Sequence, residues 1–204
     1  DEVEAERMLD YAIESGVTYI DTAYPYHDGE SEPFVGRVLK KYKREDFYLA
    51  TKLPMFKIDS LEQAKEIFEE QMKRLDVDYV DFYLLHALNK DTWKKVIDLN
   101  IIPYCEELKK QGRIKNFGFS FHDDYEVFEE IINYRDWDFC QIQLNYIDTD
   151  IQAGMKGYKL TEEKNVPLVI MEPIKGGALA SLSDDIEKVF TDYNQNVSIS
   201  SWAL

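Results

Sequence analysis

The sequence predicts an α/β protein of the (β/α)8 (TIM) barrel class, incomplete here, with about six of the eight strands. Short β-rich segments alternate with helical ones along all 204 residues, and no stretch of linker composition interrupts them. Strand follows strand at intervals of about thirty residues, the size of a βαβ unit with its crossover helix. The GxGxxG turn of an open dinucleotide-binding sheet is absent. A parallel sheet closed as a barrel is therefore favoured.

Six apolar segments rich in β-branched and aromatic residues are expected to be the strands. They are residues 18–23 (TYIDTA), 47–52 (FYLATK), 79–86 (YVDFYLLH), 114–121 (IKNFGFSF), 139–145 (FCQIQLN) and 167–173 (PLVIMEP). A complete barrel takes about 250 residues. One strand would then precede Asp1 and one would follow Leu204, so we expect residues 1–204 to be a single barrel domain truncated at both ends.

Helical patterns occupy the intervals between these strands. In residues 60–75, Ser60 stands three positions before Gln63, as in a capping box, and an apolar stripe follows. Residues 31–42 have a serine at the start and a proline just inside, as helix N-termini prefer. Further helical patterns cover residues 1–16, 122–134 and, with weaker periodicity, 154–165, while residues 197–204 form an amphipathic run.

Composition excludes several function classes. The formal net charge is −16, which argues against binding of nucleic acid, because phosphate contacts need clustered lysine and arginine. The same balance argues against an anionic membrane surface, and the chain has no apolar run of membrane-spanning length. Cys105 and Cys140 are the only cysteines, and no leader is visible. The sequence therefore predicts a cytoplasmic protein with reduced thiols.

The predicted strands end in polar side chains. These are Asp21, Lys52, His86, Ser120 and Glu172, with Gln143 and Asn145 at the end of the fifth strand. In a (β/α)8 barrel the C-terminal ends of all strands meet at one mouth, where such enzymes carry out their chemistry. Side chains that are distant in the sequence are therefore expected to converge in one cavity.

Three of these residues, together with Tyr26, suggest acid–base chemistry. Tyr26 follows Asp21 in the next loop, and Lys52 and His86 end the following strands. An ammonium beside a tyrosine stabilises its phenolate, a carboxylate orients the ammonium, and a histidine can hydrogen-bond a substrate carbonyl. Taken alone, each residue has a simpler explanation: a turn aspartate, a solvated lysine, a core histidine, a packing tyrosine. Their order at consecutive strand ends favours a site.

At these residues the sequence resembles the aldo/keto reductase family. The resemblance covers nearly the whole chain and rests on residues 16–32 (GVTYIDTAYPYHDGESE), 49–53 (LATKL), 75–86 (LDVDYVDFYLLH), 112–120 (GRIKNFGFS) and 141–146 (QIQLNY). It implies that Asp21, Tyr26, Lys52 and His86 form the catalytic tetrad. The implied reaction is the reduction of an aldehyde or ketone to an alcohol by hydride from NADH or NADPH, with Tyr26 as the general acid.

The resemblance also implies cofactor contacts. Ser120 and Gln143 would bind the carboxamide of the nicotinamide, and Met171 stands where relatives commonly present an aromatic ring to it. Phe121 stands where many relatives have asparagine. Lys175 and the backbone at Gly176 are candidates to face the pyrophosphate, although an ordinary strand-to-helix turn is an equal alternative.

The family's site for the adenosine 2′-phosphate lies beyond Leu204, so the sequence does not decide between NADP and NAD. Residues 117–123 and 171–180 are most similar to a bacterial branch whose longer members carry a cysteine-rich, ferredoxin-like segment. A 4Fe–4S cluster is therefore expected only if the native chain extends past Leu204.

Two alternatives to the reductase remain. Phe121 and Met171 suggest a non-catalytic member that binds the nicotinamide cofactor as a regulatory or scaffold subunit. A barrel hydrolase with Asp21 and Glu172 as paired carboxylates is the second. No metal site is expected, because His27, His86 and His122 lack ligand spacing. The expected partner is a small-molecule carbonyl substrate; the oligomeric state is not predicted.

Overall fold

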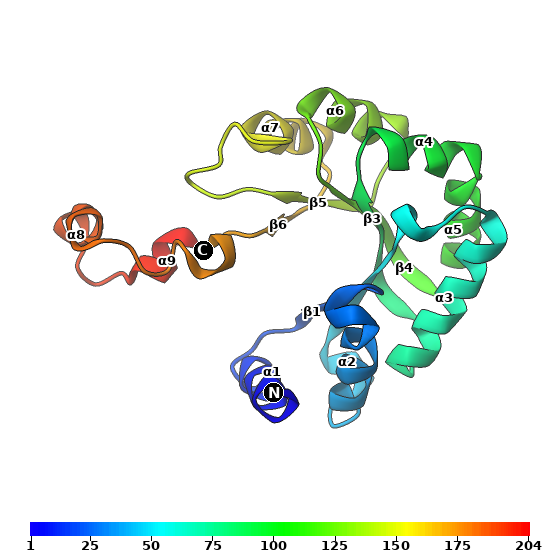
Figure 1. Cartoon of the computed structure of the whole chain (residues 1–204), viewed down its shortest axis with the longest axis horizontal. Coiled ribbons are helices and arrows are strands. Elements are labelled where there is room, and N and C mark those ends of the chain that lie inside the picture. The colour runs from blue at the N-terminus through cyan, green and yellow to red at the C-terminus, as the bar shows by residue number, and fades with distance from the viewer. The chain divides into compact units, whose positions relative to one another are not determined.

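A computed structural model describes residues 1–204 as strands that alternate with helices (Figure 1). The strands are β1 (Tyr19–Asp21), β2 (Tyr48–Leu53), β3 (Val80–Leu88), β4 (Ile114–Phe121), β5 (Phe139–Gln143) and β6 (Leu168–Met171). Each lies at its predicted segment, and the α/β class is confirmed. None of the helices is both long enough and apolar enough to cross a membrane.

Residue contacts divide the chain into two compact units, Asp1–Ser120 and Phe121–Leu204, which are described in turn. The expectation of one barrel domain over residues 1–204 stays a prediction. The first unit holds the strands from β1 to β4, neighbours in sequence order. Its helices are α1 (Glu2–Glu14), α2 (Ser31–Leu39), α3 (Leu61–Leu75), α4 (Lys90–Asp98) and α5 (Ile101–Lys110).

The first three strands pair in parallel, which brings their C-terminal ends to the same edge of the sheet. Asp21 of β1 is paired with Ala50 of β2, and Lys52 of β2 with Leu84 of β3. Strand β2 therefore continues past the end of β1, and Lys52 lies beyond the last residue of its neighbour. This offset leaves room beside Lys52 for the loop that carries Tyr26.

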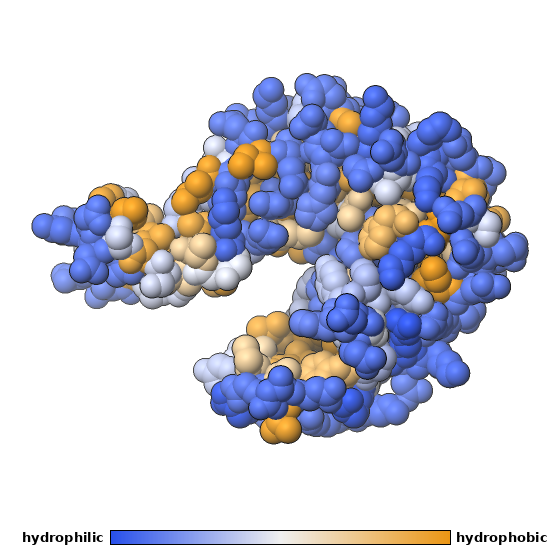
Figure 2. All heavy atoms as spheres, viewed as in Figure 1, coloured by the Kyte–Doolittle hydropathy of each residue, from blue (hydrophilic) through white to orange (hydrophobic).

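The core of the first unit lies between the sheet and helices α2 and α3. Strands β2 and β3 are buried along most of their length, as expected for a parallel sheet covered by helices. The buried apolar residues that the helices contribute include Val35, Val38 and Leu39 from α2 and Phe68, Met72 and Leu75 from α3. Hydrophilic residues dominate the visible outer faces of the helices (Figure 2).

Helix α3 begins as the sequence predicts. The Ser60 side chain accepts a hydrogen bond from the backbone N–H of Gln63. The Gln63 side chain accepts in return from the N–H of Asp59, one residue earlier than in a standard capping box. At its other end, α3 packs against Gly36 of α2 so closely that a Cβ there would lie 2.7 Å from the Arg74 carbonyl oxygen.

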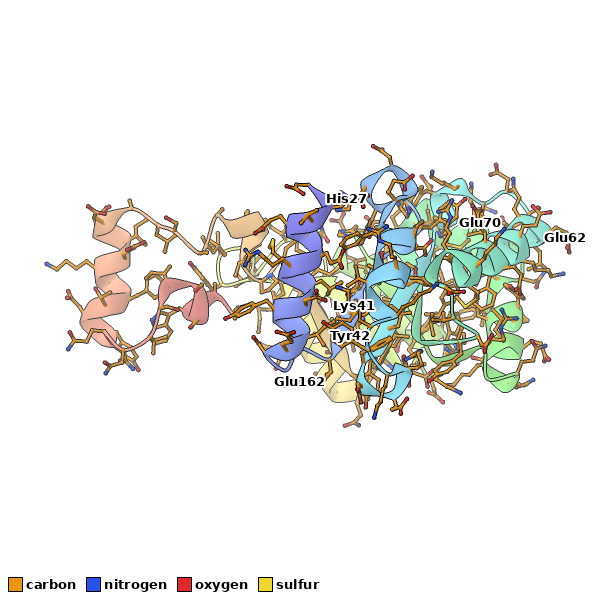
Figure 3. The ribbon with its side chains drawn as sticks, turned by 90° about the horizontal axis from the view of Figure 1, so that it is seen from below. His27, Lys41, Tyr42, Glu62, Glu70 and Glu162 are labelled. Carbon is orange, nitrogen blue, oxygen red and sulfur yellow. The ribbon has the colours of Figure 1, made fainter.

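Helix α1 is tied to the end of α2 by polar contacts. Lys41 Nζ and the Tyr42 hydroxyl both donate to the Asp10 carboxylate, each at 2.7 Å, and Lys41 also pairs with Glu6. Figure 3 shows Lys41 and Tyr42 reaching toward α1 from the segment after α2. Burial of apolar surface contributes little here, because no residue of α1 is buried.

Helices α4 and α5 were not among the predicted helices. A signal for the first was present in the sequence, because Asn89 precedes Lys90 and Thr92 follows three positions later. In the structure Asn89 and Thr92 form a capping box, with each side chain accepting from the other residue's backbone N–H. The connection between β3 and β4 therefore contains two helices.

The second unit contains the parallel pair β5–β6, with Gln143 of β5 paired with Met171 of β6. Its helices are α6 (Tyr125–Tyr134), α7 (Gly154–Lys164), α8 (Asp184–Tyr193) and α9 (Ile199–Ala203). The first two lie at predicted helical segments, and α9 falls in the amphipathic run predicted at residues 197–204. Helix α8 has three acidic residues in its first turn, where the helix dipole favours them.

Candidate active site

Lys52 is at the centre of the candidate site in the first unit. Its side chain is 1% exposed, so the ammonium needs partners to offset the loss of water. Its Nζ donates to the Asp21 carboxylate and, at 2.9 Å, to the backbone carbonyl of Thr22. Both acceptors come from the end of β1, which fixes the ammonium just beyond that strand.

Tyr26 also lies beside this ammonium. Its hydroxyl oxygen is 3.4 Å from Lys52 Nζ, and the centre of its ring is 4.9 Å from the same atom. Tyr26 is the first residue of a short 3-10 helix, Tyr26–Gly29, in which His27 and Asp28 have left-handed backbone angles. Tyr26 is 37% exposed, so a substrate in solvent can reach it.

His86 completes the cluster from strand β3. It is 8% exposed, and its ring meets the Tyr26 ring edge to face, with centroids 5.7 Å apart and planes at 76°. The ring of Phe56 also contacts His86, with the two ring centroids 5.6 Å apart. Phe56 was not predicted as a site residue, although its place just after the lysine strand was a usable signal. The structure therefore brings Asp21, Tyr26, Lys52 and His86 together, with Phe56 beside them.

Ser120, on β4, is hydrogen-bonded to strand β3, which carries His86. Its side chain is buried, and its Oγ accepts a hydrogen bond of 2.8 Å from the backbone N–H of Ala87. Ala87 has a positive φ of 53°, so the backbone bends directly after His86. A serine that accepts in this way keeps its hydroxyl hydrogen available to donate.

The other predicted cofactor residues belong to the second unit. The Gln143 side-chain oxygen accepts from the Gln152 amide at 3.2 Å, and Met171 ends β6. Gly176 has a positive φ of 63°, and a Cβ there would meet no atom within 4 Å. Phe121, noted above for its replacement of asparagine, packs edge to face on Phe128 with centroids 5.2 Å apart.

Lys175, the remaining cofactor candidate, forms an ion pair that the sequence did not predict. Its Nζ donates to both carboxylate oxygens of Asp148, at 2.8 and 2.7 Å. Asn145 donates to the same carboxylate at 3.0 Å. The Lys175 ammonium, followed by the Asn145 amide, lowers the pKa of Asp148. The charge of Lys175 is therefore balanced within this unit.

Two further observations concern the other places where a ligand or a metal ion could bind. A cavity of about 930 Å³, lined by Arg44, Met72, Tyr79 and Arg113 among others, lies at the N-terminal end of β3, away from the cluster. It includes none of the predicted site residues. No group of three or more histidine, cysteine, aspartate or glutamate residues is arranged to hold a metal ion.

Known proteins of similar sequence are oxidoreductases. The chain is 31% identical over 181 residues to the uncharacterized oxidoreductase YqkF of Bacillus subtilis, covering 84% of this chain and 56% of that protein. It is 25% identical over 186 residues to an NADH-specific methylglyoxal reductase of Escherichia coli, covering 80% of this chain and 54% of that protein. The chain thus spans about half the length of these relatives.

A solved structure with a similar fold is the holo form of aldo-keto reductase AKR11C1 from Bacillus halodurans. The TM-score is 0.73 at 30% sequence identity, with 90% of this chain and 62% of that chain covered. The predicted fold, an incomplete (β/α)8 barrel, is confirmed by this match. The model of the aldo/keto reductase family matches residues 1–201, and the chain therefore belongs to that family.

Proposed function

We propose that the protein reduces an aldehyde or ketone to an alcohol, with NADH or NADPH as the reductant and Tyr26 as the general acid. The observation that carries this proposal is the contact set of Lys52. One buried ammonium lies within 3.4 Å of the Tyr26 hydroxyl while it is bonded to the Asp21 carboxylate. That arrangement is suited to a tyrosine that must release a proton.

Each side chain has a role in this chemistry. As the carbonyl is reduced, negative charge develops on its oxygen, and the Tyr26 hydroxyl donates its proton to that oxygen. The Lys52 ammonium stabilises the phenolate that remains, and the Asp21 carboxylate orients the ammonium. His86, in ring contact with Tyr26 and Phe56, donates a hydrogen bond that orients the carbonyl.

A nicotinamide cofactor, when bound, supplies the hydride. The residues present fit such a group, because Ser120 is buried with its hydroxyl hydrogen free to donate, and Gln143 offers a side-chain amide. We propose both as contacts of the nicotinamide carboxamide, with Met171 against the ring and with Lys175 and Gly176 toward the pyrophosphate.

The relatives support a small carbonyl compound as substrate, because one of them is named a methylglyoxal reductase. The contact between Lys52 and Asp21 counts against the hydrolase alternative, because it commits the Asp21 carboxylate to an ammonium. A paired-carboxylate hydrolase needs that group for its substrate.

The test compares Tyr26→Phe with the parent protein in the reduction of small aldehydes by NADH and by NADPH. Tyr48→Phe is the matched control, since Tyr48 is an exposed tyrosine at the start of β2. We expect Tyr26→Phe to lose turnover by about 10²-fold or more while cofactor binding persists, and Tyr48→Phe to keep it. Equal turnover in Tyr26→Phe and parent would rule out the mechanism. Cofactor binding without turnover across many carbonyl compounds would favour the non-catalytic alternative.

A further inference from the structure

A buried polar network lies directly behind Lys52. Its members are Glu32 of α2, Thr51 of β2 and Gln71 of α3, each fully buried. The Thr51 hydroxyl donates to Glu32 Oε1 at 2.6 Å, and Gln71 Nε2 donates to the same oxygen at 2.7 Å. Gln71 Nε2 is also 3.0 Å from Thr51 Oγ1. None of these residues belongs to the predicted catalytic set.

The network and the catalytic cluster occupy opposite faces of β2. Successive side chains of a strand point to opposite faces. Lys52 points toward Asp21 and Tyr26, whereas Thr51, the preceding residue, points toward helices α2 and α3. A change in the network therefore reaches the catalytic side through the backbone of β2 without touching a substrate.

The direct link to Lys52 is its own carbonyl oxygen. The carbonyl of Ala50 accepts from the N–H of Thr22, which is the last backbone bond between β1 and β2. Carbonyls two residues apart on a strand point to the same side, so the Lys52 carbonyl points past the end of β1. Gln71 Nε2 donates to that carbonyl at 3.0 Å and so takes the place of the absent strand partner.

The orientation of the Gln71 amide is fixed on both sides. The Tyr83 hydroxyl donates to Gln71 Oε1 at 2.8 Å, which directs Nε2 toward its acceptors. Glu32 is the acceptor that holds Nε2 and the Thr51 hydroxyl together, and Arg74 lies 3.7 Å from its other oxygen. Arg74 also covers the ring of Tyr24, two residues before Tyr26, with 4.2 Å to its centre.

Burying a carboxylate between two helices and a strand costs the free energy of its hydration. Apolar side chains of similar size would pack there without that loss. Burial raises the pKa of Glu32, whereas its bonds to Thr51 and Gln71 oppose that rise. What the polar residues provide, and apolar ones cannot, is a directed bond to the backbone at Lys52.

We propose that Glu32 and Gln71 are positioning residues for Lys52: through Thr51 and the Lys52 carbonyl they hold the end of β2 so that the ammonium reaches both Asp21 and Tyr26. The consequence for turnover rests on the proposed reductase function. The consequence for the place of the Lys52 side chain does not, and this difference separates the two proposals experimentally.

The experiment uses Gln71→Met, which removes the bond to the Lys52 carbonyl, and Thr51→Val, which removes the hydroxyl at nearly constant shape. Thr51→Ser retains the hydroxyl and is the conservative partner. Gln111→Met is the matched control, because Gln111 is exposed and bonds only to Glu107 at 2.9 Å. The first readout is the NMR signal of the Lys52 side chain, assigned by its loss in Lys52→Met. The second is kcat and KM for carbonyl reduction.

We expect the Lys52 signal to shift in Gln71→Met and Thr51→Val, and to keep its parent position in Thr51→Ser and Gln111→Met. We expect kcat to fall about tenfold or more in the first two variants, with an unchanged KM for the cofactor. If Gln71→Met fails to fold, Thr51→Val decides the question.

A parent-like Lys52 signal in folded Gln71→Met and Thr51→Val would overturn the proposal. So would a loss of turnover that follows only the fraction of unfolded protein. If the parent itself shows no turnover, the reductase function fails, while the NMR comparison still decides whether the network positions Lys52.

Discussion

The ammonium nitrogen of Lys52 lies 3.4 Å from the hydroxyl oxygen of Tyr26, although the two residues are on different segments of the chain. The ammonium is almost fully buried, and its other acceptors are the Asp21 carboxylate and the Thr22 carbonyl. An ammonium beside a phenol stabilises the phenolate that forms when the phenol releases its proton. The effects of changing either partner can therefore be predicted.

Replacement of Lys52 by methionine should remove turnover and spare cofactor binding. The methionine fills a similar volume but cannot stabilise the Tyr26 phenolate, so we expect kcat to fall by about 10²-fold or more. Lys94→Met is the matched control, because the Lys94 side chain is 74% exposed and pairs only with Asp98 at the surface. Steady-state kinetics and cofactor titration measure both effects. Comparable losses in the two variants would contradict the role of Lys52.

Replacement of His86 should affect the carbonyl substrate more than the cofactor. His86→Leu removes the hydrogen-bond donor beside Tyr26 and Phe56, so kcat/KM for the carbonyl should fall by about 10²-fold. His86→Gln keeps an N–H donor and should recover part of this loss. The comparison of kcat/KM for the two variants tests the prediction, which fails if leucine and glutamine give equal values.

The proximity of the candidate site residues could be predicted because parallel strands bring their C-terminal ends to one edge. Asp21 and Lys52 end successive apolar runs, so their proximity follows from local pattern and one topological rule. The network of Glu32, Thr51 and Gln71 follows no such rule. Gln71 and Glu32 are 39 residues apart and meet only because α2 and α3 pack side by side.

The second unit shows the same limit on prediction. Lys175 was a candidate to face the pyrophosphate from its place in a glycine-containing turn, with an ordinary strand-to-helix turn as an equal alternative. Its bond to Asp148, 27 residues away, depends on how the loops after β5 and β6 fold against each other. Sequence pattern gives the turn and the charge, whereas the partner of that charge is a tertiary contact.

The packing of α2 on α3 supports the network, and Gly36 is the residue that permits it. A Cβ at this position would lie 2.7 Å from the carbonyl oxygens of both Arg74 and Leu75, which are backbone atoms and cannot rotate away. Alanine favours a helix over glycine by about 1 kcal/mol, but overpacking typically costs about 1–3 kcal/mol. We expect Gly36→Ala to destabilise the protein.

Urea unfolding of Gly36→Ala and parent measures this effect. Glu66→Ala, an alanine substitution at an exposed position of α3, is the control and should change the free energy of unfolding little. A Gly36→Ala variant more stable than the parent would show that helix propensity outweighs the contact with α3.

The buried carboxylate of Glu32 should give stability a specific pH dependence. Burial raises its pKa above the ordinary 4.5, so the folded protein holds the proton more tightly than the unfolded chain. The stability that this proton contributes is fully present below the unfolded pKa and is lost as the pH rises through the raised folded pKa. Glu32→Gln cannot ionise, so it should lack this decline.

The measurement is the free energy of unfolding of parent and Glu32→Gln over a pH series that starts below 4.5 and ends at neutrality. The difference, parent minus variant, should become less favourable to the parent as the pH rises, because titrations common to both proteins cancel. Glu66→Gln, at an exposed carboxylate of α3, should show no such trend. A parent-minus-variant difference for Glu32 that is constant, or that grows in the parent's favour with rising pH, would mean that burial does not dominate at Glu32. If the difference grows, the donors around Glu32 outweigh its loss of hydration, and the network stabilises the fold as well as placing Lys52.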